Sequence, residues 1–279
     1  MKTLEDLKKK YFKKVDFLDL DLIVAEIIKK TREFVLSHPE YTPSGAQIAK
    51  IESFIHRRAK HEPLAYILGH KEFYGLTFKV TPDTLIPRPE TELLVEETLK
   101  ILQTTNHELQ TIIDIGTGSG NIIISIAKNY KLKTTNYIAI DVSKKALGVA
   151  KQNAKLNKVS KKIKFVHGNL LDKIENTNNS IIIANLPYLD KDWKNLLKSS
   201  DSAGLKFEPA TALYGGKDGL DFYRELAEQI KSKKIQNSIL LCEIGHLQAP
   251  GMKKTFSFAR KVEFQKDLAK KWRICKIEI

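Results

Sequence analysis

The segment 111–141 constrains the fold more than any other part of the chain. Its first residues, Thr111–Ile115, are apolar and mostly β-branched, which is typical of a buried strand. A glycine-rich turn, a helical pattern over 121–129 and a second apolar run over 137–140 follow, and the second run ends at Asp141. This order of strand, turn, helix, strand and acid predicts a parallel sheet that binds a ligand at its carboxyl edge.

The turn itself, Gly116-Thr117-Gly118-Ser119-Gly120, indicates the class of ligand. Glycines let the backbone approach a ligand closely, and the N-terminus of the helix lies behind them. The dinucleotide fingerprint has its third glycine one position later, where this chain has Asn121. The spacing Gly-x-Gly-x-Gly fits S-adenosylmethionine sites better, and an acid about 20 residues further on, as Asp141 is, contacts ribose hydroxyls. We therefore predict S-adenosylmethionine as the cofactor.

A second segment predicts where the chemistry takes place. The buried-strand pattern of Ser180–Ala184 runs directly into Asn185-Leu186-Pro187-Tyr188, again at the carboxyl edge of the sheet. This tetrapeptide resembles the Asn-Pro-Pro-Tyr motifs of methyltransferases that act on a planar amide or amino nitrogen. A turn without chemistry is the alternative, because Asn and Pro both favour turns.

The motif has a physical logic. An amide nitrogen is a poor nucleophile because its lone pair is delocalised. The side-chain carbonyl of Asn185 and the backbone carbonyl of Leu186 can accept its two N–H bonds, which leaves the lone pair facing the methyl donor. Pro187 fixes φ in the turn, and Tyr188 offers a ring face to the planar group. Orientation of this kind can lower a barrier by about 7–11 kcal/mol.

The remaining segments complete an α/β pattern that follows a helical N-terminus. Residues 4–68 carry apolar side chains at helical spacing, with Ser44 as an N-cap, and residues 73–80 predict a hairpin with its turn at Tyr74-Gly75. Pro89 fits the first turn of a helix. Strands at 163–167, 238–244, 262–265 and 273–279, with a helix near 220–230, complete a sheet covered on both faces.

Composition excludes several classes of protein. The chain has no long uncharged apolar run and no signal-peptide core, so we expect no membrane span and a cytoplasmic protein. Cys242 and Cys275 lie in apolar segments, where we expect them buried and reduced, and no His, Cys and Asp cluster has metal-ligand spacing. The net charge of +14 comes mainly from scattered Lys, which favours a solvated surface over direct nucleic-acid binding.

With these residues assembled, the chain resembles the release factor glutamine methyltransferase family (HemK/PrmC type) almost from end to end. Several of the shared strings lie outside the general cofactor site, which makes them specific, whereas residues 1–60 match by helical character alone. The shared strings are Glu62 to Gly69, Leu85 to Glu92, Asp114 to Gly120, Asn185 to Tyr188, Phe207 to Leu213 with Gly219-Leu220, Glu243 to Gln248, and Lys266 to Leu268 with Arg273.

The resemblance implies an α/β fold with a Rossmann-like class I methyltransferase sheet of about seven strands, the last one antiparallel, and a small N-terminal helical domain. It divides the chain into a helical substrate-docking domain (1–70), a hairpin linker (71–88) and an S-adenosylmethionine-dependent methyltransferase domain (89–279). The implied reaction is methylation of the side-chain amide of the Gln in the Gly-Gly-Gln motif of class 1 peptide chain release factors. We expect the protein to be a monomer.

The resemblance also implies roles for individual residues. The catalytic amide clamp is Asn185, Leu186, Pro187 and Tyr188, and the substrate contacts are these four with Arg88 and Glu90. Asp141 maps to the ribose contact and Leu170 to the adenine-flanking position. The full set of implied cofactor contacts is Asp114, Gly116, Thr117, Gly118, Ser119, Gly120, Asp141, Asn169, Leu170 and Asn185.

Two departures from the family pattern bear on these roles. Gly168-Asn169-Leu170 stands where the family has Gly-Asp followed by an aromatic residue, although an aliphatic side chain can still pack on a ring. Leu186 replaces the first Pro of the motif, but the backbone carbonyl that accepts the hydrogen bond is unchanged. We therefore expect Leu186→Pro to keep activity near the wild-type level.

Three alternatives remain. Ribosomal-RNA adenine dimethyltransferases also use Asn-Leu-Pro-Tyr, but in them the methyltransferase domain precedes the helical part. A glutamine methyltransferase of a ribosomal protein differs in the segment that matches Pro87–Glu92. The non-enzyme alternative is a basic ribosome- or RNA-binding module, against which the intact Asp114, Asp141 and Asn185 argue.

Overall fold

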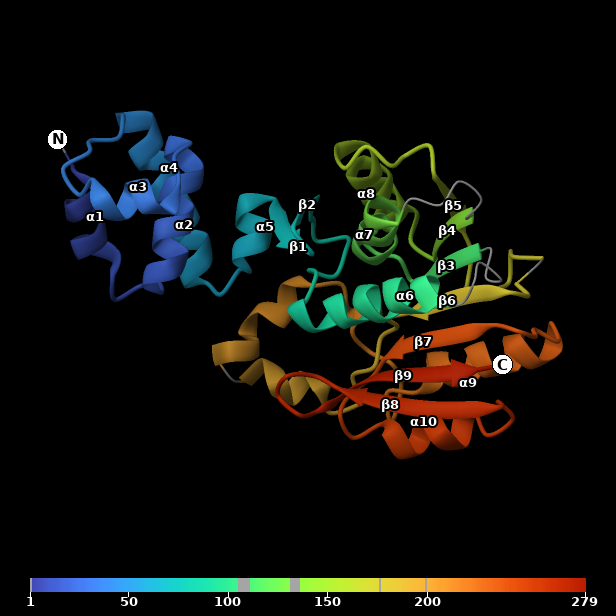
Figure 1. Ribbon diagram of the computed structural model, residues 1–279. Coiled ribbons are helices and arrows are strands. Elements are labelled where there is room, and N and C mark those ends of the chain that lie inside the picture. The colour runs from blue at the N-terminus through green and yellow to red at the C-terminus, as the bar shows by residue number, and fades with distance from the viewer. Residues whose placement is uncertain (1, 105–110, 131–135, 176, 199) are drawn as a thin grey trace. The chain divides into compact units, whose positions relative to one another are not determined.

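A computed structural model describes residues 2–104, 111–130, 136–175, 177–198 and 200–279 (Figure 1). The chain forms two compact units, one of Met1–Gly69 with Leu197–Phe207 and the other of His70–Leu196 with Glu208–Ile279. Among the described residues, no helix is long and apolar enough to cross a membrane, and no group of three His, Cys, Asp or Glu could hold a metal ion.

The first unit is helical, as the spacing of its apolar residues predicts. Ser44 caps its longest helix: its hydroxyl accepts the Gln47 N–H at 3.3 Å, and the Gln47 side chain accepts the Ser44 N–H at 2.8 Å. Leu and Ile side chains of several helices form a core of its own. The elements are α1 (Leu4–Tyr11), α2 (Phe17–Ile28), α3 (Arg32–Ser37), α4 (Gly45–Ala59), α5 (Leu64–Leu68) and the 3-10 helix η3 (Ser200–Phe207).

The second unit is built on a seven-stranded sheet in the order β5-β4-β3-β6-β7-β9-β8. The strands from β5 to β7 pair in parallel, and β9 is antiparallel to both of its neighbours. This confirms the predicted Rossmann-like class I sheet with an antiparallel last strand. The strands are β3 (Thr111–Ile115), β4 (Asn136–Asp141), β5 (Ile163–His167), β6 (Ser180–Ala184), β7 (Ile239–Glu243), β8 (Lys261–Lys266) and β9 (Trp272–Glu278).

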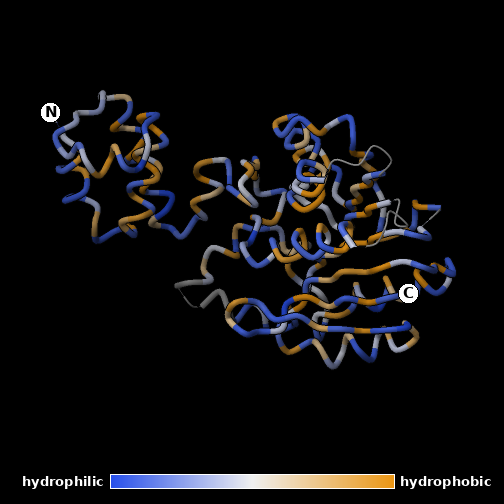
Figure 2. The backbone as a smooth tube through the Cα atoms, viewed as in Figure 1, coloured by the Kyte–Doolittle hydropathy of each residue, from blue (hydrophilic) through white to orange (hydrophobic). Residues whose placement is uncertain are grey.

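Side chains that alternate along the central strands separate two apolar cores. Ile113 and Ile115 of β3 pack in the layer of α9 and α10, whereas Ile112 packs in the layer of α6, α7 and α8. Because both faces are covered, the central strands are hydrophobic along most of their length (Figure 2). The helices are α6 (Glu92–Thr104), α7 (Asn121–Asn129), α8 (Lys144–Leu156), α9 (Asp221–Ser232) and α10 (Ala249–Thr255).

The predicted hairpin is formed by β1 (His70–Phe73) and β2 (Leu76–Lys79). Both residues of its turn, Tyr74-Gly75, have positive φ, at 50° and 68°, as a type I′ turn requires. The Tyr74 N–H donates to Oε1 of Glu92 at 2.8 Å, which ties the hairpin to the start of α6. A 3-10 turn, η1 (Pro89–Thr91), leads into α6 with proline at its first position, as predicted.

Cys242 and Cys275 are buried free thiols that lie opposite each other on β7 and β9, which confirms their predicted burial. The sequence did not predict α10, because Pro250 and Gly251 stand near its start and read as a turn. The short 3-10 helices η2 (Trp193–Lys198) and η4 (Ala210–Ala212) were also not predicted.

Candidate active site

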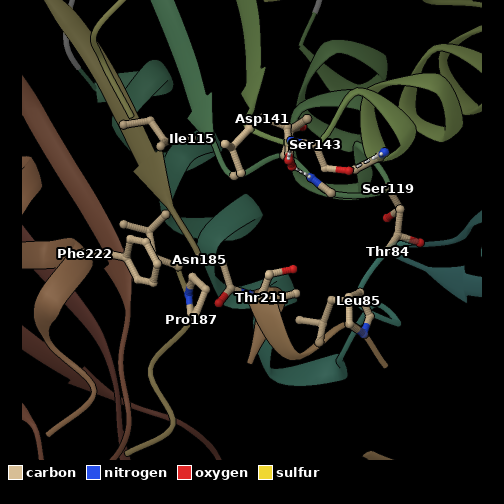
Figure 3. Close-up of a pocket in the computed structure, with 18 of the residues that line it drawn as sticks. Thr84, Leu85, Ile115, Ser119, Asp141, Ser143, Asn185, Pro187, Thr211 and Phe222 are labelled. Carbon is tan, nitrogen blue, oxygen red and sulfur yellow. Dashed lines mark hydrogen bonds between the residues drawn. The ribbon is translucent and has the colours of Figure 1, made fainter. Parts of the chain in front are cut away.

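A cavity of about 940 Å³ lies at the carboxyl ends of β3, β4, β5 and β6 in the second unit. Ligands bind at this edge in open α/β sheets. Asp141 and Ser143 lie on one side of it, and Asn185, Pro187 and Phe222 lie on the opposite side (Figure 3). The remaining walls include residues 82–88, Lys191, Trp193, Lys194, residues 209–212 and Tyr214.

The glycine loop (116–120) joins β3 to α7 and depends on backbone conformation. Its three glycines have φ values between 55° and 80°, in the left-handed region. A Cβ on Gly116 would lie 3.3 Å from Cδ2 of Leu186, so the loop is in direct contact with the Asn-Leu-Pro-Tyr segment. The buried Asn153 of α8 donates to the Ser119 carbonyl at 2.8 Å and holds the far end of the loop.

Asp141 ends β4 and lines the cavity. One carboxylate oxygen accepts the Gly118 N–H at 2.8 Å, and the other accepts the Ser143 N–H at 2.8 Å. Burial raises the pKa of Asp141, and these two hydrogen bonds oppose the rise. Each oxygen keeps a second lone pair, so the carboxylate can also accept from the hydroxyls of a ligand.

Asp114 supports the loop and does not line the cavity. Its carboxylate is fully buried, and one oxygen accepts the Thr117 hydroxyl at 2.6 Å. The other oxygen has no hydrogen-bond partner among the residues that the structure describes. Burial raises the pKa of Asp114 to about 7. Through its hydrogen bond with Thr117, Asp114 holds the glycine loop from the side away from the cavity.

Asn169 and Leu170 follow β5 and both line the cavity. The Asn169 amide donates to Oε1 of Glu225 at 2.6 Å. Leu170 has a φ of 52°, unusual for a leucine, and the next N–H, that of Leu171, donates to Oε1 of Gln229 at 2.7 Å. The Leu170 side chain is buried in the apolar core that continues to the cavity wall, so an apolar surface for a ring is present despite the missing aromatic residue.

Asn185 is held by hydrogen bonds from its nitrogen. Nδ2 donates to Oγ1 of Thr91 at 3.2 Å and to Oε2 of Glu243 at 3.1 Å. Glu243 also accepts the Thr91 hydroxyl at 2.6 Å and the Tyr188 hydroxyl at 3.2 Å. No described residue donates to Oδ1 of Asn185 or to the carbonyl oxygen of Leu186, and both residues line the cavity. Within the described part of the chain, the two acceptors of the predicted clamp therefore have no donor.

The rest of the Asn-Leu-Pro-Tyr segment is fixed by close backbone packing. A Cβ on Gly215 would lie 2.2 Å from the carbonyl oxygen of Pro187, and one on Gly219 would lie 2.1 Å from that of Tyr188. Gln248 donates to the same Tyr188 oxygen at 2.9 Å. Burial and the neighbouring Glu243 carboxylate raise the pKa of Tyr188 well above its usual value. The Tyr188 ring is thus part of the support for the turn and does not line the cavity.

Arg88 lines the cavity and forms an ion pair with Glu208. Glu208 is buried, and its other oxygen accepts the Ile86 N–H at 3.0 Å. This contact joins two of the sequence strings that carry the family resemblance, residues 85–92 and residues 207–213. Glu90 is not among the residues that line the cavity.

The structure thus brings most of the predicted site residues together, namely Arg88, Gly116, Thr117, Gly118, Ser119, Asp141, Asn169, Leu170, Asn185, Leu186 and Pro187. Asp114, Gly120, Glu90 and Tyr188 do not line the cavity. Sequence reasoning assigned no role to Thr91, Glu208, Phe222 or Glu243. Thr91, Glu208 and Glu243 lie in strings that carry the family resemblance, but the resemblance alone does not indicate what these side chains do. Phe222 has no signal in the sequence beyond its place on a helix.

The cavity fits S-adenosylmethionine. Asp141 has lone pairs free for ribose hydroxyls, and Ile115, Val142 and Leu170 supply apolar surface for a purine. A Cβ on Gly118 would meet no atom nearer than the carbonyl oxygen of Gly116, at 3.9 Å, so the loop backbone is open to a ligand at that position. The volume is within the range of about 300–1,000 Å³ that is usual for small-molecule sites.

Fold and site together define an S-adenosylmethionine-dependent methyltransferase. Residues 5–69 match the model of the PrmC N-terminal domain, and residues 95–200 match that of ribosomal protein L11 methyltransferase (PrmA). The chain is 39% identical to a release factor glutamine methyltransferase from Coxiella burnetii, over 83% of this chain and 80% of that protein. It is 34% identical to another from Thermodesulfovibrio yellowstonii, over 88% and 87%. The chain belongs to the release factor glutamine methyltransferase family.

Solved structures agree with this fold. The catalytic domain of human METTL16, crystallised with a hairpin of the MAT2A 3′UTR, has a TM-score of 0.58 with 17% identity. The match covers 84% of this chain and 82% of that one. At this level of identity the likeness concerns the fold alone.

Proposed function

We propose that this protein methylates the side-chain amide nitrogen of the Gln in the Gly-Gly-Gln motif of class 1 peptide chain release factors. The observation that carries the proposal is the pair of free acceptors, Oδ1 of Asn185 and the Leu186 carbonyl, beside the glycine loop in one cavity. A primary amide has two N–H bonds to match them. The names of the relatives, release factor glutamine methyltransferases, support a release factor as the substrate.

The contribution of the chain to the reaction is orientation. S-adenosylmethionine supplies a methyl group on a positively charged sulfur, which leaves as a neutral thioether when the N–C bond forms. Asn185 and Leu186 hold both N–H bonds in the amide plane, so that the nitrogen lone pair points out of that plane. Contact between Leu186 and Gly116 keeps this clamp beside the cofactor loop. No general base is needed before transfer, because the positively charged product nitrogen readily releases a proton to water.

We further propose that the protein acts as a cytoplasmic monomer, with the helical unit as the docking domain for the release factor. The match of residues 5–69 to the PrmC N-terminal domain supports a role specific to this family for the helical unit. Light scattering of the purified protein tests the oligomeric state.

Mass spectrometry tests the substrate. Purified release factor is incubated with this protein and S-adenosylmethionine, and the peptide that contains Gly-Gly-Gln is analysed. We expect one added methyl group on that Gln, absent when Asn185→Ala replaces the wild type. An unmodified release factor, with label transferred to ribosomal RNA instead, would overturn the proposal in favour of adenine methylation.

A further inference from the structure

The side chain of Glu243 accepts hydrogen bonds from residues of the clamp but does not line the cavity. Glu243 is the last residue of β7 and is 2% exposed. Among the described residues, its three hydrogen-bond donors come from two other segments, the turn before α6 and the Asn-Leu-Pro-Tyr segment. It is not among the residues that line the cavity. Burying a carboxylate costs folding free energy unless the charge is paired and hydrogen-bonded.

The direction of these hydrogen bonds determines how the Asn185 amide is turned. A carboxylate can only accept, so the Thr91 hydroxyl must give its hydrogen to Glu243, as the 2.6 Å distance indicates. The Thr91 oxygen then has only lone pairs left to offer Asn185. Both neighbours of the amide are therefore acceptors, and Nδ2 faces them at 3.1 Å and 3.2 Å. The opposite orientation would set Oδ1 against two oxygens away from water.

The groups around Glu243 act on its charge in opposite directions. Burial raises its pKa, but the Thr91 and Tyr188 hydroxyls and the nearby Arg273 guanidinium oppose that rise. Arg273 is itself paired with Asp267 at 3.1 Å. The carboxylate therefore has both the hydrogen bonds and the positive neighbour that a buried anion requires.

We infer that Glu243, acting with Thr91, is a positioning residue that locks Oδ1 of Asn185 toward the substrate and so makes the site selective for an amide over a carboxylate. The inference rests on the proposed function. An amide presents N–H bonds to Oδ1, whereas a carboxylate of the same shape presents only lone pairs, which Oδ1 repels. If the Asn185 amide turned so that Nδ2 faced the cavity, its N–H bonds could donate to a carboxylate, and the site would then bind a carboxylate as well.

The test compares wild type with Glu243→Gln, Thr91→Val and Thr91→Ser. Turnover is measured on the release factor, and the release factor with Glu in place of the motif Gln is used as a competitive inhibitor. In Glu243→Gln we expect kcat to fall about tenfold or more, with cofactor affinity unchanged. The Glu form should then bind closer to the Gln form, with the ratio of their affinities shifted by about fivefold or more. Thr91→Val should shift the ratio in the same direction, and Thr91→Ser should restore it.

Calorimetry with S-adenosylmethionine shows that each variant is folded. A loss of kcat in Glu243→Gln and Thr91→Val with an unchanged Gln-to-Glu ratio would overturn the inference and leave Glu243 as a structural residue. Wild-type turnover in both variants would overturn it as well. If wild type binds the cofactor but does not methylate the release factor, the proposed function itself fails, and the inference falls with it.

Discussion

The two sides of the cavity are built by different means. On the side predicted to bind the cofactor, the backbone N–H of Gly118 donates to Asp141, which follows within the same βαβ segment. On the side predicted to bind the substrate, Asn185 donates hydrogen bonds to Thr91 and Glu243, residues 94 and 58 positions away. The first arrangement is local in sequence and depends mainly on backbone groups. The second fixes which atom of the Asn185 amide faces the cavity, and it requires side chains from three elements.

Removal of the Asn185 amide should give the largest difference between the effect on turnover and the effect on cofactor affinity. We expect Asn185→Ala to lower kcat by about 10²–10³, the effect of deleting one oriented hydrogen-bond partner of the reacting group. Cofactor affinity, measured by calorimetry, should stay near the wild-type value. Asn195→Ala, an exposed asparagine outside the cavity wall, is the matched control. Equal losses in turnover and cofactor affinity would show that the two sides are not independent.

The complementary change on the cofactor side is Asp141→Ala. Loss of a carboxylate that accepts hydroxyl hydrogen bonds should weaken S-adenosylmethionine binding by about 10–100-fold, since such charge-assisted bonds contribute about 1.5–3 kcal/mol. Asp141→Asn keeps one acceptor oxygen and should show a smaller loss. Calorimetry measures both. Unchanged cofactor affinity in both variants would rule out a ribose contact at this position.

Beneath the loop, Asp114 should make stability depend on pH. Its folded pKa of about 7 lies above the usual value of 3.8, so the folded state binds more protons between these values. The free energy of unfolding should therefore fall as pH rises through this window. Asp114→Asn should flatten the decline, with a change of several degrees in the difference between Tm at pH 5 and at pH 8, since about 1 kcal/mol shifts Tm by about 2–4 °C at this size. Parallel Tm curves for the two proteins would contradict the assignment.

The smallest effect is expected from Leu186→Pro, at the contact between the two sides. The substitution keeps the backbone carbonyl that completes the clamp, and the proline ring retains part of the apolar contact with Gly116. Turnover on the release factor should stay near the wild-type level. A large loss would mean that the turn requires the buried leucine side chain or its N–H.

Sequence reasoning succeeded where the determinants are local. Thr111–Ile115, the glycine loop and Ser180–Ala184 have the predicted bounds, because β-branched runs and glycines specify backbone conformation from one residue to the next. The two acceptors at Asn185 and Leu186 were also predicted, from the Asn-Leu-Pro-Tyr motif alone. These features account for the centre of the sheet and for the part of the cavity wall that Ile115, residues 116–119, Asn185 and Leu186 form.

The support behind the clamp was beyond such reasoning. Tyr188 was expected to offer its ring face to the substrate, but its hydroxyl is bound to Glu243 and its ring lies off the wall. Glu243 attracts that hydroxyl because a buried carboxylate needs donors, and only the folded sheet brings β7 beside β6. The ion pair of Arg88 with Glu208 joins segments 120 residues apart in the same way.

Because Trp193 lies in the cavity wall, it is an intrinsic fluorescence probe of that cavity. The chain has two tryptophans. Trp193 lines the cavity and is 9% exposed, whereas Trp272 lies on β9 against Phe264. Trp272→Phe would leave a single fluorophore, placed where ligands arrive. Changes in its emission could then follow cofactor and substrate entry in real time, without a label and before any chemistry occurs.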